Sequence, residues 1–317
     1  MPILESSPRQ ESIMSRPTAC IFWLLATATC AISSAQTPTP SEPAVSPVIK
    51  DVEFQSRGIT LSGIIVIPAK TVAAVVLVDG AGQTLRKTGM AQVLANQGIA
   101  ALTYDKRGVG KSGGVYAGPE VHTNNASPEN LDLLAADANA AVDALSHKIA
   151  RHPVPIGLIG FSQGGWIAPL AATRSARVKF MVFWSGPVVT IRESVRFEIL
   201  TGHDPEFWDH HTEAEVREHI RSDPDRYRFI DTDPVESLRE LSIPGLWLFG
   251  GRDVNVLTGL SIERLRALAA SGKPYEYELF PEAGHQLVED TAIPAIVGWI
   301  HKTAGTRSEL PAVGRSP

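Results

Sequence analysis

Gly160-Phe161-Ser162-Gln163-Gly164 is the stretch of sequence that decides the fold. It directly follows the apolar run at residues 154–159 and precedes a segment of small and apolar residues at 166–173. This context predicts a strand, a sharp turn and a helix. A serine in such a turn occupies a strained backbone conformation, and glycines two residues to either side let neighbouring segments pass without a Cβ clash.

The predicted turn places reactive groups together. The Ser162 hydroxyl would project from the sheet edge, and the backbone N–H of Gln163 would lie at the helix N-terminus. Unpaired amides and the helix dipole favour a developing negative charge there. We therefore predict Ser162 as a nucleophile and Gln163 as an oxyanion-hole donor. The alternative is a structural turn serine, because the G-x-S-x-G pattern alone also arises by chance.

Two later strands are each followed by a possible partner of Ser162. The run GLWLFG at residues 245–250 predicts a buried strand with Asp253 in the loop after it, and YEYELF at 275–280 predicts another with His285 in the loop after it. Open α/β sheets place their ligand sites at the carboxyl ends of parallel strands. The order Ser162, Asp253, His285 is therefore typical of a catalytic triad.

The segments GFSQGG (160–165), GGRD (250–253) and AGH (283–285) together resemble the α/β-hydrolase superfamily over roughly residues 50–303. The segment YDKRGVGKSGG (104–114), followed later by GLIGFSQGGWIAPLAA (157–172), is similar to bacterial serine hydrolases of the dienelactone hydrolase-like and prolyl oligopeptidase-like branch. The resemblance implies an α/β fold with a mostly parallel eight-stranded sheet, helices on both faces and a helical cap insertion.

The same resemblance implies a second oxyanion N–H, in the loop after the third strand. In the sequence Val78-Asp79-Gly80-Ala81-Gly82 this donor would be Ala81. The family usually carries a histidine in this loop, where the present chain has Asp79. Because an inward-pointing carboxylate would oppose the oxyanion, we expect Asp79 to be turned away and hydrogen-bonded, or the loop to differ.

The rest of the chain alternates strand and helix patterns, as a mostly parallel sheet requires. A helix is expected to start at Pro128 with Ser127 as its cap. Strands are predicted at residues 51–56, 61–67, 73–78, 100–104, 156–159 and 179–184, and further helices at 87–96, 128–147, 258–270 and 291–302.

Residues 191–241 interrupt this alternation and predict a cap over the site. Its aromatic side chains would either line an acyl or aryl pocket or form the insertion's own small core. These are Phe197, Phe207, Trp208, Tyr227 and Phe229. Trp184 and Ser185, at the carboxyl end of a strand, are predicted to contribute to the substrate pocket.

The N-terminal residues predict a secretory signal. Arg16 precedes an apolar run at 18–32, and Ser33-Ser34-Ala35 is a small-x-small cleavage pattern, so cleavage is expected after Ala35, with Met14 as the true start. Lipidation at Cys30 is a weaker alternative. The run is shorter than the twenty or so residues of a membrane span. We expect a periplasmic or secreted product: a signal at 1–35, a Pro-rich linker at 36–49, the hydrolase domain at 50–303 and a tail at 304–317.

Composition limits the partners and cofactors. Both cysteines, Cys20 and Cys30, lie in the predicted signal, so the exported chain would hold no disulfide or thiolate metal site. The formal net charge of −5 with mixed signs argues against a nucleic-acid partner. Residues 108–113 match G-x-G-x-x-G, but Asp105 stands where a P-loop needs glycine. We expect Asp105 and Arg107 to brace that loop instead.

Histidines crowd the insertion and raise the question of a metal site. They are His203, His210, His211 and His219, and only His211 and His219 share a plausible helical face. No carboxylate or cysteine set completes a tetrahedral pattern, so we predict solvated histidines, no metal and no cofactor.

The sequence thus predicts an exported serine hydrolase that cleaves a small-molecule ester or other acyl substrate through Ser162, His285 and Asp253. A serine peptidase or thioesterase of the same fold is one alternative. A second is an exported binding protein without catalysis, because a fold does not by itself imply an activity.

Overall fold

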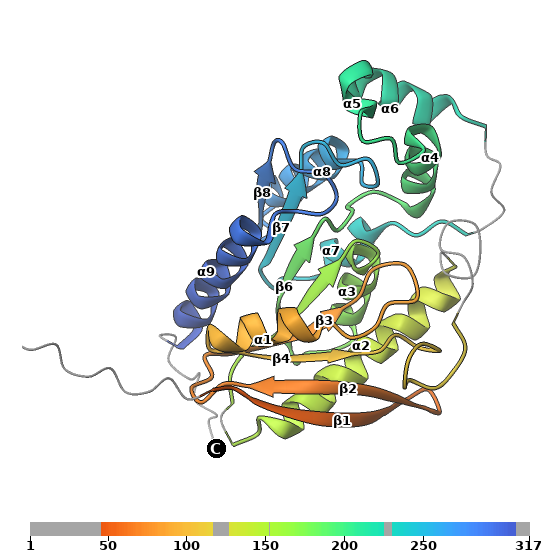
Figure 1. Cartoon of the computed structure of the whole chain (residues 1–317). Helices are drawn as coiled ribbons and strands as arrows, with labels where there is room; N and C mark the ends of the chain where they lie inside the picture. Colours follow the sequence, from red (N-terminus) through yellow and green to blue (C-terminus); the bar gives the residue numbers. More distant parts are fainter. Residues whose placement is uncertain (1–45, 117–126, 152, 225–229, 309–317) are drawn as a thin grey trace, which may run out of the picture. The chain divides into compact units, whose positions relative to one another are not determined.

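Short apolar runs of the sequence form the strands of one sheet. The computed structural model describes residues 46–116, 127–151, 153–224 and 230–308, and the sheet has eight strands in the order β1-β2-β4-β3-β5-β6-β7-β8 (Figure 1). β2 pairs antiparallel with β1 and with β4, and every other neighbouring pair is parallel. The strands are β1 (Val48–Ser56), β2 (Ile59–Ile67), β3 (Ala73–Val78), β4 (Ile99–Tyr104), β5 (Ile156–Phe161), β6 (Val178–Trp184), β7 (Gly245–Gly250) and β8 (Tyr275–Phe280).

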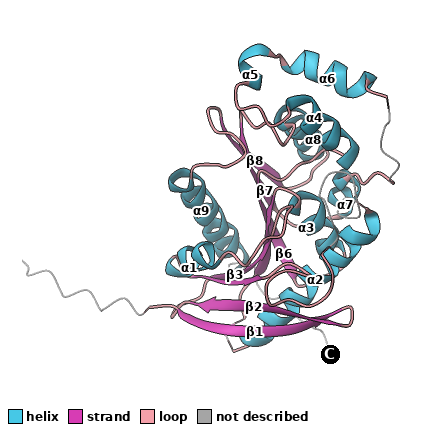
Figure 2. Ribbon diagram, turned by 45° about the vertical axis from the view of Figure 1, so that its right-hand side comes forward, coloured by secondary structure: helices cyan, strands magenta, loops and turns pink. Residues whose placement is uncertain are grey.

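Helices cover both faces of this sheet (Figure 2). One apolar core joins one face to α2, α3, α7 and α8, and a second core joins the other face to α1 and α9. Strands β3, β4 and β7 are buried along their whole length, because helices cover the sheet on both faces. The helices of these two layers are α1 (Thr88–Asn96), α2 (Pro128–Lys148), α3 (Gly164–Thr173), α7 (Pro234–Glu240), α8 (Thr258–Ala270) and α9 (Glu289–Ser308).

The insertion between β6 and β7 also contains α4 (Ile191–Thr201), α5 (Phe207–His210) and α6 (Glu213–Ser222). Thr190 and Thr212 begin α4 and α6 with reciprocal capping boxes, and Gly202 ends α4 in the left-handed conformation. Among the described residues, no helix combines the length and the apolar character needed to cross a membrane.

The predicted fold class is confirmed: a mostly parallel eight-stranded sheet with helices on both faces. β3, β7, β8 and α8 have the predicted bounds, and Ser127 caps α2 as expected by accepting from the Asn130 N–H. Helix α9 begins two residues earlier than predicted and continues to Ser308. The predicted signal at 1–35, most of the linker, Tyr227, Phe229 and residues 309–317 lie outside the described residues.

Candidate active site

Ser162 lies in a tight turn between β5 and α3. Its φ of 48° is in the left-handed region, which a residue with a Cβ adopts only under strain. Its N–H donates to the Trp184 carbonyl at 3.0 Å, and its own carbonyl accepts from the Gly165 N–H at 2.7 Å. A Cβ on Gly160 would approach the Gly164 carbonyl to 2.8 Å, so these glycines allow the close crossing that the sequence predicts.

Asp253 and His285 form a bonded pair on the loops after β7 and β8. Nδ1 of His285 lies 2.8 Å from Oδ2 of Asp253, and the other carboxylate oxygen accepts the backbone N–H groups of Asn255 and Val256 at 2.7 and 2.9 Å. The Asp253 side chain is fully buried. Because a carboxylate only accepts, Nδ1 carries the shared hydrogen and Nε2 is left as the basic nitrogen.

The charges around His285 favour its protonated form. Burial lowers the pKa of His285, but the hydrogen bond and charge of Asp253, together with the charge of Glu198, outweigh it and raise that pKa above the usual value. Ser185 holds the same loop, because its Oγ donates to the His285 carbonyl at 2.8 Å. His285 is thus held at its ring by Asp253 and at its backbone carbonyl by Ser185.

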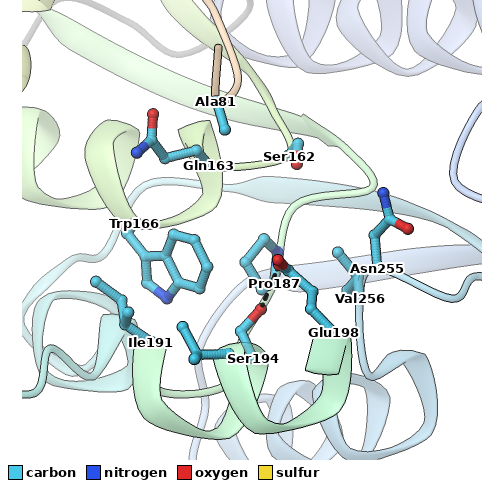
Figure 3. A pocket seen from close by; sticks show the side chains of 11 residues that line it. Ala81, Ser162, Gln163, Trp166, Pro187, Ile191, Ser194, Glu198, Asn255 and Val256 are labelled. Carbon is cyan, nitrogen blue, oxygen red and sulfur yellow. Dashed lines mark hydrogen bonds between the residues drawn. The ribbon is translucent and has the colours of Figure 1, made fainter. Parts of the chain in front are cut away.

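Ser162 lies where two cavities meet. The first, which we call the α4 cavity, measures about 490 Å³ (Figure 3). It is lined by Gln163, Trp166, Pro187, Ile191, Ser194, Val195, Glu198 and Val256. The second, the His285 cavity, measures about 1140 Å³, is more open, and is lined by Lys87, Phe161, Trp184, His285, Gln286 and Glu289 among others. Ser162, Ala81 and Asn255 line both.

Glu198 brings a carboxyl group into the α4 cavity from the cap. Burial raises the pKa of Glu198 to about 7, against the opposing charges of His203 and His285 and a hydrogen bond from Ser194. That bond, Ser194 Oγ to Glu198 Oε1, measures 3.5 Å (Figure 3). Sequence reasoning did not find Glu198, because nothing in the local pattern shows which face of α4 turns toward Ser162.

The loop after β3 packs directly on the turn that carries Ser162. A Cβ on Gly80 would lie 3.1 Å from the Cβ of Ser162, and the next residue, Ala81, lines both cavities. Asp79 is buried beside Tyr104 and Lys106 at a separate small cavity. Lys87 Nζ lies 3.3 Å from Oδ1 of Asp79. Burial raises the pKa of Asp79, although the ion pair with Lys87 opposes this shift. The Asp79 side chain therefore lines neither cavity at Ser162 and is paired with Lys87 instead.

The segment at 104–114 is a braced loop, as expected. Asp105 accepts two hydrogen bonds from the Arg86 side chain, at 2.9 and 2.7 Å, and one from the Lys111 N–H at 3.0 Å. Burial works against ionisation, but these bonds lower the pKa of Asp105 to about 2. Arg107 forms a buried ion pair with Asp137 of α2.

Comparison with known proteins adds the family. A sequence model of the serine aminopeptidase S33 family matches residues 69–235, just over half of the chain. The chain belongs to this family. The match includes Ser162 and Ala81 and ends before Asp253 and His285.

The sequence identity to an individual curated relative is low. A Methylorubrum extorquens protein provisionally named as a carboxymethylenebutenolidase is 26% identical over 170 residues, which are 52% of this chain and 46% of that protein. The chain therefore matches about half the length of this curated relative.

Solved hydrolases share the fold. An esterase of Pyrococcus furiosus superposes with a TM-score of 0.60 at 18% identity, covering 82% of this chain and 91% of that one. A dienelactone hydrolase of Anabaena variabilis gives 0.53 at 19%, covering 83% and 99%. An acylaminoacyl peptidase of Pyrococcus horikoshii gives 0.57 at 15%, covering 86% of this chain and 44% of its own. The chain thus has the α/β-hydrolase fold, in agreement with its membership of the serine aminopeptidase family.

One pocket prediction, that of Ser185, is wrong. Trp184 lines the His285 cavity, but Ser185 lines neither cavity, because it is 1% exposed and its hydroxyl is turned to the His285 carbonyl. Of the predicted cap aromatics that the structure describes, Phe197, Phe207 and Trp208 pack on one another in one apolar cluster. Of the two open alternatives, packing into a core is the one observed, although Val189 and Leu257 from outside the insertion also belong to that core. Ile191 and Val195 of α4 supply apolar walls of the α4 cavity.

The histidines of the insertion are scattered. His211 precedes α6 and stacks on Phe207 with ring centroids 4.3 Å apart, whereas His219 lies on α6, so the two do not share a helical face. His203 Nδ1 lies 3.1 Å from Oδ1 of Asn255. The described part of the chain holds no group of three or more His, Cys, Asp or Glu side chains arranged to bind a metal ion.

Proposed function

We propose that this chain hydrolyses carboxylic esters through an acyl-enzyme on Ser162, with His285 as general base and Asp253 as its orienting partner. The observation that carries the proposal is the 2.8 Å pair of His285 and Asp253, whose imidazole lines the same cavity as Ser162. The strained turn at Ser162 supports the assignment, because strained residues cluster at functional sites.

In the first step, Nε2 of His285 takes the Ser162 proton as Oγ bonds to the substrate carbonyl carbon. The carbonyl oxygen becomes an oxyanion that accepts hydrogen bonds from the N–H groups of Gln163 and Ala81. When the intermediate collapses, the bond to the alcohol oxygen breaks and the imidazolium gives that oxygen its proton. Water then attacks the acyl carbon by the same route and releases the acid.

In this mechanism the two cavities hold different parts of the ester substrate. A leaving alcohol must reach His285 for its proton, and His285 lines only the second cavity. The acyl group then occupies the α4 cavity, whose walls include Trp166, Ile191 and Val195. This division supports a small ester with an apolar acyl group.

Peptide hydrolysis is the second candidate function. Glu198 places a carboxyl group in the α4 cavity, where an ionised form would bind the amino group of a peptide N-terminus. The family description, serine aminopeptidase, agrees with that possibility. A thioester substrate would use the same steps, whereas a non-catalytic binding protein would use none of them.

A fluorophosphonate probe and ester hydrolysis test the catalytic proposal together. We expect the full chain to be labelled on Ser162 and to hydrolyse p-nitrophenyl esters. In Ser162→Ala, kcat should fall by about four or more powers of ten with an unchanged thermal midpoint, as in other serine-triad knockouts. Hydrolysis close to the wild-type rate by the pure variant would refute the assignment, and absence of labelling in wild type would favour a binding protein.

A matched panel separates the substrate classes. Each acyl group is presented as p-nitrophenyl ester, thioester and p-nitroanilide, with and without a free α-amino group. The ester proposal predicts the highest kcat/KM for uncharged esters. Cleavage restricted to anilides with a free amino group, lost in Glu198→Gln, would make aminopeptidase the function.

We further propose that the protein is exported, with removal of residues 1–35. The support is the apolar run at 18–32 followed by Ser33-Ser34-Ala35. Expression of the full chain in a bacterial host, followed by fractionation and intact-mass measurement, should give a periplasmic or secreted product that begins at Gln36. A cytoplasmic product that keeps residues 1–35 would overturn this proposal.

A further inference from the structure

A buried ammonium group lies behind the candidate oxyanion hole. Lys106 is 4% exposed, and its Nζ donates to the Gly80 carbonyl at 2.8 Å and approaches the Gly82 carbonyl at 3.4 Å. It also donates to Oε1 of Gln163 at 3.0 Å. One charged group therefore connects the loop after β3 with the residue that follows Ser162.

The contact with Gly80 fixes the direction of the proposed donor at Ala81. The Gly80 carbonyl and the Ala81 N–H belong to one planar trans peptide and point in opposite directions. Because Lys106 holds the carbonyl, the N–H is aimed away from Lys106. No acceptor among the described residues takes this N–H, and Ala81 lines both cavities beside Ser162.

The contact with Gln163 acts on the other proposed donor. The Gln163 side chain is buried at 4% exposure and sits at the N-cap of α3, one residue after the nucleophile. A hydrogen bond to a charged group is stronger than a neutral one, so it restrains this side chain and the peptide that carries the N–H. The N–H groups of Ala81 and Gln163 are thus both positioned by the Lys106 ammonium group.

We propose that Lys106 is a positioning residue that fixes the two oxyanion-hole donors, the N–H groups of Gln163 and Ala81, relative to each other. This inference rests on the proposed function. Lys106 lines neither cavity at Ser162 but borders a small cavity behind them with Asp79 and Tyr104, so it acts through the peptides that it binds. A role in stability alone would change the unfolding temperature without selectively weakening transition-state binding.

The test compares Lys106→Met with Lys111→Met, a matched loss of charge at an exposed lysine of the same loop. We expect kcat of Lys106→Met for a p-nitrophenyl ester to fall about 100-fold, as when one oxyanion donor is removed. KM should change less than about threefold, because ground-state binding is retained. The affinity for a trifluoromethyl ketone, which forms an oxyanion adduct on the serine, should fall in parallel with kcat/KM. Lys111→Met should match wild type in each.

A second variant covers the case in which Lys106→Met does not fold. Gln163→Leu removes one acceptor of the ammonium and leaves the backbone donor and all charges in place. It should lower kcat about three- to tenfold and weaken the affinity for the trifluoromethyl ketone in parallel with kcat/KM for the small acetate ester, because a supporting bond rather than a donor is lost. The acetate ester is used because Gln163 also lines the α4 cavity.

The outcomes are distinct. A folded Lys106→Met with kcat and ketone affinity within about threefold of wild type, or an unaltered Gln163→Leu when Lys106→Met does not fold, overturns this inference alone. A wild-type protein that neither reacts with fluorophosphonate nor cleaves esters would instead overturn the proposed function.

Discussion

At the residue scale, two carboxyl groups act on one imidazole in different ways. Asp253 is bonded to His285 and held by two backbone N–H groups, so its charge and position are fixed. Glu198 acts on His285 through charge, and its pKa of about 7 means that this charge appears only as the pH approaches neutrality. The basicity of His285 therefore depends on the ionisation of a cap residue.

Glu198→Gln should shift the pH dependence of catalysis. The Glu198 carboxylate raises the pKa of His285, and a neutral glutamine removes that contribution. In the proposed mechanism His285 must be neutral to accept the Ser162 proton, so the acidic limb of the kcat/KM profile should move to lower pH. The other groups near Glu198, namely Asp253, His203 and Ser194, are unchanged. Profiles from pH 5 to 9 at constant ionic strength that superimpose for the two proteins would contradict this.

At the element scale, helix α4 contributes to the core of the insertion on one side and to both the main core and the α4 cavity on another. Phe197 is fully buried in the core of the insertion, whereas Ile191, Ser194, Val195 and Glu198 line the α4 cavity. The i, i+3, i+4 and i+7 spacing of these four residues places them on one stripe of the helix. Substitutions on the two faces should therefore have different effects.

Val195→Phe should restrict the acyl group. Added volume at this 4% exposed position fills the α4 cavity, so kcat/KM for p-nitrophenyl octanoate should fall about tenfold or more, with less than a threefold change for the acetate ester. Ile199→Phe, one turn further along and 43% exposed, is the control for adding a ring to this helix. Equal losses on both esters would show that Val195 does not limit the acyl site.

At the scale of the whole molecule, Glu198 also links stability to pH. Its folded-state pKa of about 7 lies above the ordinary 4.5, so its contribution to stability is complete below about pH 4.5 and lost as pH rises through 7. Glu198→Gln removes this dependence. Relative to wild type, the variant should gain on the order of 3 kcal/mol in unfolding free energy between pH 4.5 and 8. Urea unfolding at both pH values measures this, and a constant difference would refute it.

The elements that could be predicted from the sequence are those whose bounds are determined by neighbouring residues. Proline and glycine bound the apolar runs of β7 and β8, and the helix cap at Ser127 is explicit in the residues, so these elements were found. The fold then brings the loops after β5, β7 and β8 to one edge. Contacts that depend on how separate elements pack were not predictable. Glu198 is one example, and Lys106, in a segment interpreted only as a braced loop, is another.

The position of Ser162 between the α4 cavity and the His285 cavity has a consequence for turnover. In the proposed cycle, the departing alcohol and the incoming water use the same open side, while the acyl chain stays behind under the cap. Any small nucleophile that enters from that side competes with water for the acyl-enzyme. The proposed cycle therefore predicts transesterification as well as hydrolysis, with a product ratio set by the relative concentrations of alcohol and water.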